Sequence, residues 1–158
     1  MKERKPIRLK DWDYSQPGEY FLTICAKGHS AIFGRVVGTS IARPPEVVLS
    51  PLGRLVRQAV EAIPEHYPSV RVEKAVVMPN HLHLLLRLQP VDGRAMLVPT
   101  VAEVVRQMKG YVTKQAGFAV WQGRYHDHIV RDQEDHDRIW TYLEENPAKW
   151  TEDIYYTE

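Results

Sequence analysis

The chain of 158 residues is 44% hydrophobic and carries a formal net charge of +1, which fits one domain with a hydrophobic core and excludes wholesale disorder. Its single cysteine, Cys25, excludes an internal disulfide and a cysteine-based zinc cluster. No apolar run reaches the roughly 18 residues of a membrane span. We therefore expect one soluble cytoplasmic domain over 1–158, with a basic arm at 1–10 and a C-terminal tail at 151–158.

The residues that follow the basic arm predict short strands. Tyr20–Cys25 is aromatic and β-branched, as is typical of a strand. A weaker strand is expected over 31–37, before a loop that contains Gly, Pro and Ser, and a short extended piece is expected over 47–49.

A helix is expected to follow directly. Ser50 is a good N-cap, and Pro51 fits the first helical position. The apolar residues that follow recur every three or four positions, which predicts one buried helix face. Pro64 and Pro68 are expected to end the helix.

The middle of the chain predicts a β-hairpin. Residues 70–77 have the pattern of a strand, the turn lies at 78–80, and 81–88 returns as the antiparallel partner. Alternate side chains of a strand face opposite sides, so His81 and His83 share one face of the second strand. The opposite face is wholly apolar and consists of Leu82, Leu84, Leu86 and Leu88.

The last third predicts a helix, a strand and a final helix. The first helix starts near Thr100, the strand covers 128–130, and Asp132 caps the final helix, which runs to about Asn146 before Pro147. The buried stripe of the first helix is expected to be Val101, Val104, Val105, Met108, Tyr111 and Val112. Hairpin strands with interleaved helices predict an α+β, ferredoxin-like sandwich, an antiparallel sheet with helices packed on it.

Two pairs of residues could carry chemistry. His81 and His83 project from one strand face with Cβ atoms roughly 6–7 Å apart, so both imidazoles can converge on one metal ion. Tyr142 and Asn146 are one helical turn apart on the final helix. Taken alone, each pair also has a structural interpretation: imidazoles on a polar sheet face, a tyrosine at a core edge, and an asparagine at a helix end.

Motifs in both halves of the chain resemble those of the REP-associated tyrosine transposases, which are single-tyrosine relatives of insertion-sequence transposases in the His-hydrophobe-His (HUH) endonuclease class. These motifs lie at Met78–His83, Trp121–Gln122, Asp127–Arg131 and Tyr142–Pro147. The resemblance extends from about residue 7 to 155. It implies that the final helix carries the nucleophilic tyrosine.

The resemblance also implies an activity and its residues. His81 and His83 match the metal-binding pair, Tyr142 the nucleophile, and Asn146 the polar residue that completes the metal site. The implied enzyme cleaves and rejoins single-stranded DNA at hairpin or palindromic sequences through a 5′-phosphotyrosine intermediate. Two nitrogen ligands and one oxygen ligand with open positions suit Mg²⁺ or Mn²⁺ as the cofactor.

The predicted partner is single-stranded or hairpin DNA, with no membrane, in a cytoplasmic and nucleoid-associated location. Residues 1–124 carry 18 basic and 10 acidic side chains, while 125–158 carry 3 basic and 10 acidic ones, and a basic body is compatible with a polyanion. Candidate DNA-binding residues are Arg8, Lys10, Arg87, Arg106, Lys109 and Trp121. We expect a homodimer, with a monomer as the alternative.

Two other functions are compatible with parts of the pattern. One is a non-catalytic protein on the same scaffold that binds hairpin or single-stranded DNA, although a pure binder has no need of His81, His83, Tyr142 and Asn146 together. The other is a metallohydrolase in which Tyr142 is structural, although no acidic general base lies close to the histidines in sequence.

Overall fold

The computed structural model describes residues 17–38, 45–89 and 98–150. Four strands form an antiparallel sheet in the order β4-β5-β1-β6. They are β1 (Gly18–Cys25), β4 (Val70–Met78), β5 (His81–Leu88) and β6 (His126–Ile129). With α1 (Pro51–Glu61) between β1 and β4 and α3 (Val101–Ala116) between β5 and β6, this is the ferredoxin-like connectivity that the sequence predicts.

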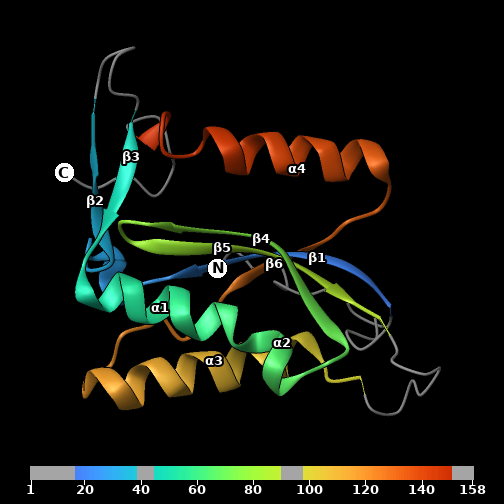
Figure 1. Cartoon of the computed structure of the whole chain (residues 1–158), viewed down its shortest axis with the longest axis horizontal. Coiled ribbons are helices and arrows are strands. Elements are labelled where there is room, and N and C mark those ends of the chain that lie inside the picture. The colour runs from blue at the N-terminus through green and yellow to red at the C-terminus, as the bar shows by residue number, and fades with distance from the viewer. Residues whose placement is uncertain (1–16, 39–44, 90–97, 151–158) are drawn as a thin grey trace, which may run out of the picture.

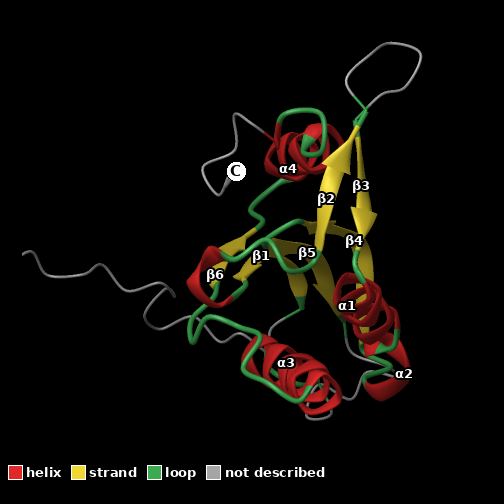
Figure 2. Cartoon of the chain, turned by 90° about the vertical axis from the view of Figure 1, so that its left-hand side faces the viewer, coloured by secondary structure: helices red, strands yellow, loops and turns green. Residues whose placement is uncertain are grey.

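The sheet is covered by helices on both faces, as Figures 1 and 2 show. Helices α1 and α3, with the short α2 (Ile63–His66), lie on one face, and α4 (Gln133–Glu145) lies on the other. A separate hairpin of β2 (Gly34–Val37) and β3 (Glu46–Leu49) rises on the α4 side. A single 3₁₀ turn over Lys27–His29 follows β1.

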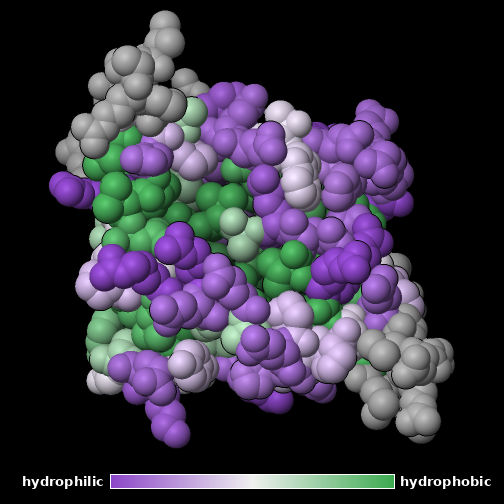
Figure 3. All heavy atoms as spheres, viewed as in Figure 1, coloured by the Kyte–Doolittle hydropathy of each residue, from purple (hydrophilic) through white to green (hydrophobic). Residues whose placement is uncertain are grey.

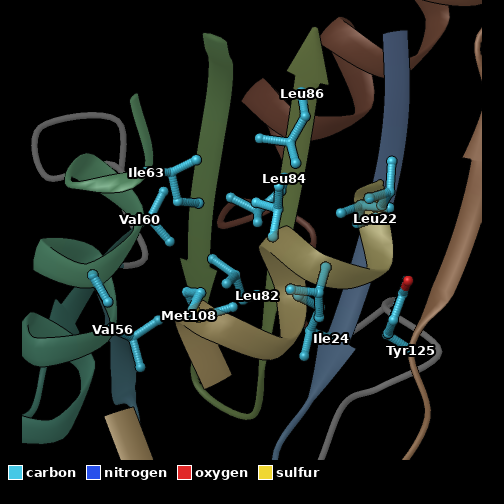
Figure 4. Packing of buried hydrophobic residues seen from close by; sticks show 14 of the residues in the cluster. Leu22, Ile24, Val56, Val60, Ile63, Leu82, Leu84, Leu86, Met108 and Tyr125 are labelled. Atoms are coloured by element: carbon cyan, nitrogen blue, oxygen red, sulfur yellow. The ribbon is translucent and has the colours of Figure 1, made fainter. Parts of the chain in front are cut away.

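The main core lies between the sheet and α1 and α3. The four alternating leucines of β5 are fully buried there, and Figure 4 shows three of them directed at side chains of α1 and α3. A smaller cluster of Leu85, Ile139 and Leu143 packs α4 against the other face. The face of β5 that carries the histidines is therefore enclosed by a helix.

Helix α1 begins where the sequence predicts. The backbone N–H of Gly53 donates to Ser50 Oγ at 3.0 Å, and Ser50 Oγ donates to the carbonyl of Ile32 at 2.7 Å. A Cβ at Gly53 would lie 1.9 Å from the carbonyl oxygen of Phe33, so only glycine allows the helix to approach the β2–β3 hairpin this closely.

Strand β2 begins at Gly34, later than the expected strand over 31–37, and three further differences have a physical reason. Pro64 does not end α1, because α1 stops at Glu61 and Pro64 lies in the first turn of α2, where no backbone N–H is needed. Tyr111 is 45% exposed because it lies at the edge of the buried face of α3, over the groove toward α1. Strand β6 begins at His126 instead of His128, because its register is set by pairing with Tyr20–Thr23 of β1.

Hydrophobic side chains also reach the surface. On the face drawn in Figure 3 they gather over the β2–β3 hairpin. Next to it a groove of about 290 Å³ runs between β3, α1, β4 and the residue after α4, with Val47, Leu49, Val77 and Pro147 in its lining. None of the helices in the described ranges is long and apolar enough to cross a membrane.

Candidate active site

The two histidines of β5 meet on the α4 side of the sheet. His81 and His83 are 0% and 1% exposed, and their rings pack edge to face with centroids 4.5 Å apart. Their Nε2 atoms are 3.0 Å apart. The imidazoles are thus buried and convergent, not exposed on a polar sheet face.

Asn80 determines which nitrogen of His81 carries hydrogen. The side-chain nitrogen of Asn80 donates to the backbone carbonyl of His29 at 3.3 Å, and a carbonyl can only accept. The amide oxygen therefore faces His81 Nδ1 at 2.8 Å and accepts a hydrogen bond from it. This leaves Nε2 of His81 with its lone pair directed at His83.

The neighbouring strand holds His83 in a matching way. His83 Nδ1 lies 3.0 Å from Thr23 Oγ1, and the ring also donates to the backbone of Leu22. Thr23 and His83 are direct cross-strand partners in the pairing of β1 with β5. The Thr23 hydroxyl can donate to Nδ1 or accept from it, and where it accepts, Nε2 of His83 also presents a lone pair.

Burial keeps both rings neutral. Desolvation, followed by the proximity of His83 and of His29, lowers the pKa of His81 from 6.5 to about 2. Desolvation also lowers the pKa of His83 to about 3, although its bond to Leu22 acts in the opposite direction. At neutral pH the Nε2 atoms of two uncharged rings therefore face each other at 3.0 Å, and two adjacent positions of an octahedral ion with bonds of about 2.1 Å are also about 3.0 Å apart.

The end of α4 passes along this pair. The ring of Tyr142 lies edge-on to His83 with centroids 5.5 Å apart, and Trp150 stacks on His81 with centroids 6.1 Å apart. Asn146 lies midway between them in the chain, four residues from each. It is 3% exposed, and its Oδ1 is buried without a hydrogen-bond partner among the described residues.

The donors that the structure brings together here are the Nε2 atoms of His81 and His83. No group of three or more His, Cys, Asp or Glu side chains in the described part of the chain could hold a metal ion. With the buried amide oxygen of Asn146 the two Nε2 atoms would make a mixed nitrogen and oxygen set, and the role of Asn146 as a ligand stays a prediction. Tyr142 is 41% exposed, so solvent and a large substrate can reach its ring.

Apolar and polar contacts hold α4 in this position. Ile139 and Leu143 pack against Leu85, and His136 Nδ1 lies 2.8 Å from Glu19 Oε2 on β1. At the start of the helix, Asp135 accepts from three donors, which are His128 Nε2 at 2.7 Å, the backbone N–H of Arg131 at 3.1 Å and Arg138 Nη2 at 2.7 Å. Burial opposes ionisation of Asp135, but these hydrogen bonds outweigh it and lower the pKa of its carboxyl below the usual range.

The predicted DNA-binding residues fall into three groups. Arg8 and Lys10, with the rest of the basic arm, lie outside the described residues, as does the tail at 151–158. Arg87 shares the face of the histidines, but its guanidinium pairs with Glu19 and with Glu73, the latter at 3.0 Å. The remaining three candidates line a single cavity beside α3; they are Arg106, Lys109 and Trp121.

Several residues that shape the site were not predicted. Asn80 precedes His81 directly in the hairpin turn, so its position next to the histidines in sequence could have indicated its role. Thr23 precedes His83 by 60 residues, and Phe21 stacks on the same ring with centroids 5.3 Å apart. Only the pairing of β1 with β5 brings these two to the site.

Two proteins of Haemophilus influenzae are similar to this chain in sequence. No family model matches it. An uncharacterized protein of Haemophilus influenzae is 34% identical over an alignment that covers 100% of this chain and 96% of the relative. A second protein of that organism, named "Putative REP-associated tyrosine transposase", is 28% identical over 102 residues, 59% of this chain and 57% of the relative.

Solved structures agree with this fold. A REP-associated tyrosine transposase bound to a REP hairpin superposes with a TM-score of 0.66 at 20% identity, covering 94% of this chain and 74% of the other. A "putative transposase" from Deinococcus radiodurans gives a TM-score of 0.52 at 16% identity, covering 89% of this chain and 98% of the other. The chain therefore belongs to one family with the Haemophilus influenzae protein that is 34% identical to it. Its resemblance to the REP-associated tyrosine transposases is confirmed.

Proposed function

We propose that this protein is a transposase that cleaves and rejoins single-stranded DNA, with Tyr142 as the nucleophile. One observation carries the proposal: the ring of Tyr142 lies 5.5 Å from that of His83, whose Nε2 is 3.0 Å from Nε2 of His81. The similarity to transposases supports the general role. Metal dependence and the covalent mechanism are inferred from the side chains.

A divalent ion, Mg²⁺ or Mn²⁺, fits the donor set of His81, His83 and Asn146. When bound there, it would polarise the scissile phosphate and stabilise negative charge on the leaving oxygen. The chain supports this by offering two neutral imidazoles and a buried amide oxygen without a partner among the described residues. Asn80 and Thr23 orient the imidazoles, as such outer partners do at metal sites.

Cleavage by Tyr142 is a transesterification. The phenol oxygen forms a bond to phosphorus, the bond from phosphorus to the 3′ oxygen breaks, the phenol proton passes to solvent, and the 3′ oxygen gains a proton. The products are a 5′-phosphotyrosine and a free 3′-OH. Attack by a 3′-OH on this phosphotyrosine reverses the bond changes and joins DNA, so no nucleotide energy source is needed.

We propose hairpin or palindromic DNA as the substrate. A solved protein of the same fold is bound to a REP hairpin, which supports this substrate class. A cytoplasmic, nucleoid-associated location follows from a DNA substrate and stays a prediction. The homodimer also stays a prediction.

The decisive experiment traps the covalent intermediate. The protein is incubated with Mn²⁺ and a labelled DNA hairpin that carries a single-stranded extension, then denatured and separated by electrophoresis. We expect a labelled protein adduct with the wild type and with Tyr111→Phe, which alters an exposed tyrosine on α3, and none with Tyr142→Phe. An adduct that persists in Tyr142→Phe would refute the nucleophile.

A second variant separates the metal pair from DNA binding. His81→Ala should abolish the adduct while retaining most of the affinity for the hairpin, because the imidazole is buried and acts through the ion. If the adduct and the affinity for the hairpin are lost to the same extent, the histidine pair has a structural role. Hairpin binding with no adduct from the wild type would favour the non-catalytic binding protein.

A further inference from the structure

A cavity lies on the face of the sheet opposite to the histidine pair. It has a volume of about 650 Å³, within the range of small-molecule sites, and opens between α3 and the segment over 119–125 that leads into β6. Part of its wall is apolar and consists of Ala102, Val105, Ala119 and Val120. It is separate from the site formed by β5 and α4.

The charges around this cavity suit an anion. Arg106, Lys109 and Lys114 all line it from α3, and none of the described lining residues is acidic. Lys109 Nζ donates to the backbone carbonyl of Gln122 at 2.9 Å, so one cation spans the cavity from the helix to the facing segment. Arg106 and Lys114 are exposed. The combination of an apolar wall and a cationic rim fits a ligand with a flat apolar part and a phosphate.

Two further features shape the cavity. Trp121 lines the cavity, is only 8% exposed, and packs its ring against that of Phe33 with centroids 5.2 Å apart. Gly110 lines the cavity in the interior of α3, and a Cβ added there would meet no atom within 4 Å. The first gives the cavity a fixed aromatic wall, and the second keeps its entrance open.

The cavity is close to the histidines across the sheet. Trp121 forms an isolated bridge with Ala26, and the N–H of Ala26 donates to the carbonyl of Asn80 at 2.9 Å. Neighbouring strands are about 4.8 Å apart, so the backbone of Trp121 lies about 10 Å from the turn before His81. A DNA strand that passes around this edge of the sheet can reach both sites.

We propose that the cavity binds one unpaired nucleotide of the DNA on which the protein acts. The base lies against the apolar wall, and its phosphate is held by Arg106, Lys109 and Lys114. This inference rests on the proposed function for the identity of the ligand as DNA. It adds a site that anchors the strand on the face away from cleavage.

Blocking the cavity without removing charge tests the proposal. Gly110→Phe places a ring in the open space, whereas Gln115→Phe places the same ring on an exposed position of α3 that does not line the cavity. Affinity is measured by fluorescence anisotropy with a labelled hairpin that carries a single-stranded extension. We expect Gly110→Phe to bind about tenfold more weakly, because its ring occupies the space of the base and the apolar surface of the base stays exposed to water, and Gln115→Phe to bind like the wild type.

The cations are tested through salt dependence. Replacing both Arg106 and Lys114 by Ala should reduce the slope of log K against log salt by about 1.4, the value for two contacts to single-stranded phosphates. Arg57→Ala, which removes an exposed cation of α1 that does not line this cavity, should leave the slope unchanged. An equal change of the slope in the double variant and in Arg57→Ala would overturn the proposed site.

Photo-crosslinking locates the base directly. With 5-iodouracil at successive positions of the extension, we expect one position to crosslink within 119–125, and crosslinks confined to other segments would overturn the proposal. The Tyr142 adduct is measured on the same proteins. If Gly110→Phe binds DNA with wild-type affinity and forms the adduct normally, the cavity is not a DNA site and the proposed function stands. If the cavity crosslinks to DNA but the wild type forms no adduct, the cavity stands and the proposed function fails.

Discussion

Asn80 acts on the candidate metal site through the position of one hydrogen atom. Its amide nitrogen is committed to the carbonyl of His29, so its oxygen must face Nδ1 of His81. A ring protonated on Nδ1 has its lone pair on Nε2, the atom that faces His83. Asn80 is 1% exposed, so no bulk water competes for this hydrogen bond.

Replacing Asn80 should therefore weaken metal binding while the ligands stay intact. We expect Asn80→Ala to bind Mn²⁺ about 10- to 100-fold more weakly, the usual effect of losing an outer hydrogen-bond partner of a metal ligand. Calorimetry measures the affinity, and ¹⁵N NMR of the metal-free protein reports which nitrogen of His81 carries hydrogen. Asn80→Asp keeps the acceptor oxygen and should keep hydrogen on Nδ1. Wild-type Mn²⁺ affinity in Asn80→Ala would contradict the positioning role.

At the scale of elements, α4 carries Tyr142 but is held by residues from other parts of the chain. Ile139 and Leu143 rest on Leu85 of β5, and His136 pairs with Glu19 of β1. Because Tyr142 and Leu143 are neighbours on one helix, the buried leucine fixes the height of the tyrosine above the sheet. The position of the nucleophile is thus set by packing of the whole helix.

The β2–β3 hairpin and α1 form a second junction between elements, and it depends on Gly53. The carbonyl of Phe33 accepts from the backbone N–H of Ser50 at 2.9 Å, and it leaves no room for a Cβ at Gly53. We expect Gly53→Ala to lower the free energy of unfolding by about 1–3 kcal/mol, as overpacking does. Urea denaturation measures the change.

A second glycine in a helix provides the matched control for this prediction. Gly110→Ala has open space around the added methyl group, so it should raise the free energy of unfolding by up to about 1 kcal/mol through helix propensity. Equal effects of the two substitutions would show that the close approach at Gly53 is not constrained.

At the scale of the whole molecule, local patterns predicted most of the fold. The caps at Ser50, Thr100 and Asp132 and the alternation along β5 are local, and the structure has all of them. The prediction that Pro64 ends the helix is wrong, because a proline that stops one helix also fits the first turn of the next. The bounds of β6 depend on its partner strand, which local spacing does not reveal.

The candidate site was predictable to a lesser degree. The spacing of His81 and His83, and that of Tyr142 and Asn146, follow from a strand and a helix. Their meeting requires that α4 cover the face of β5 opposite to α1 and α3, and no spacing along the chain contains that information. The resemblance to a known family supplied the link between the two pairs, and their catalytic and metal-binding roles stay predictions.

Burial of two neutral imidazoles makes the stability of the whole fold depend on pH. The pKa values of about 2 for His81 and about 3 for His83 lie below the ordinary 6.5, so from 6.5 down to these values the unfolded chain binds more protons than the folded one. Their contribution is complete above pH 6.5 and is lost as the pH falls below it. Between pH 7 and pH 5 we expect each imidazole to lower the free energy of unfolding by about 2 kcal/mol.

Urea denaturation at several pH values measures this loss, and two variants assign it. His83→Gln removes one buried imidazole and should reduce the decline, whereas His66→Gln alters an exposed histidine of α2 and should leave it unchanged. In the folded protein the NMR signals of both buried rings should remain those of neutral imidazole down to pH 5. Titration of either ring near pH 6.5 would mean that solvent reaches the pair. The two Nε2 atoms would then not be held in the low-polarity setting that favours a cation between them.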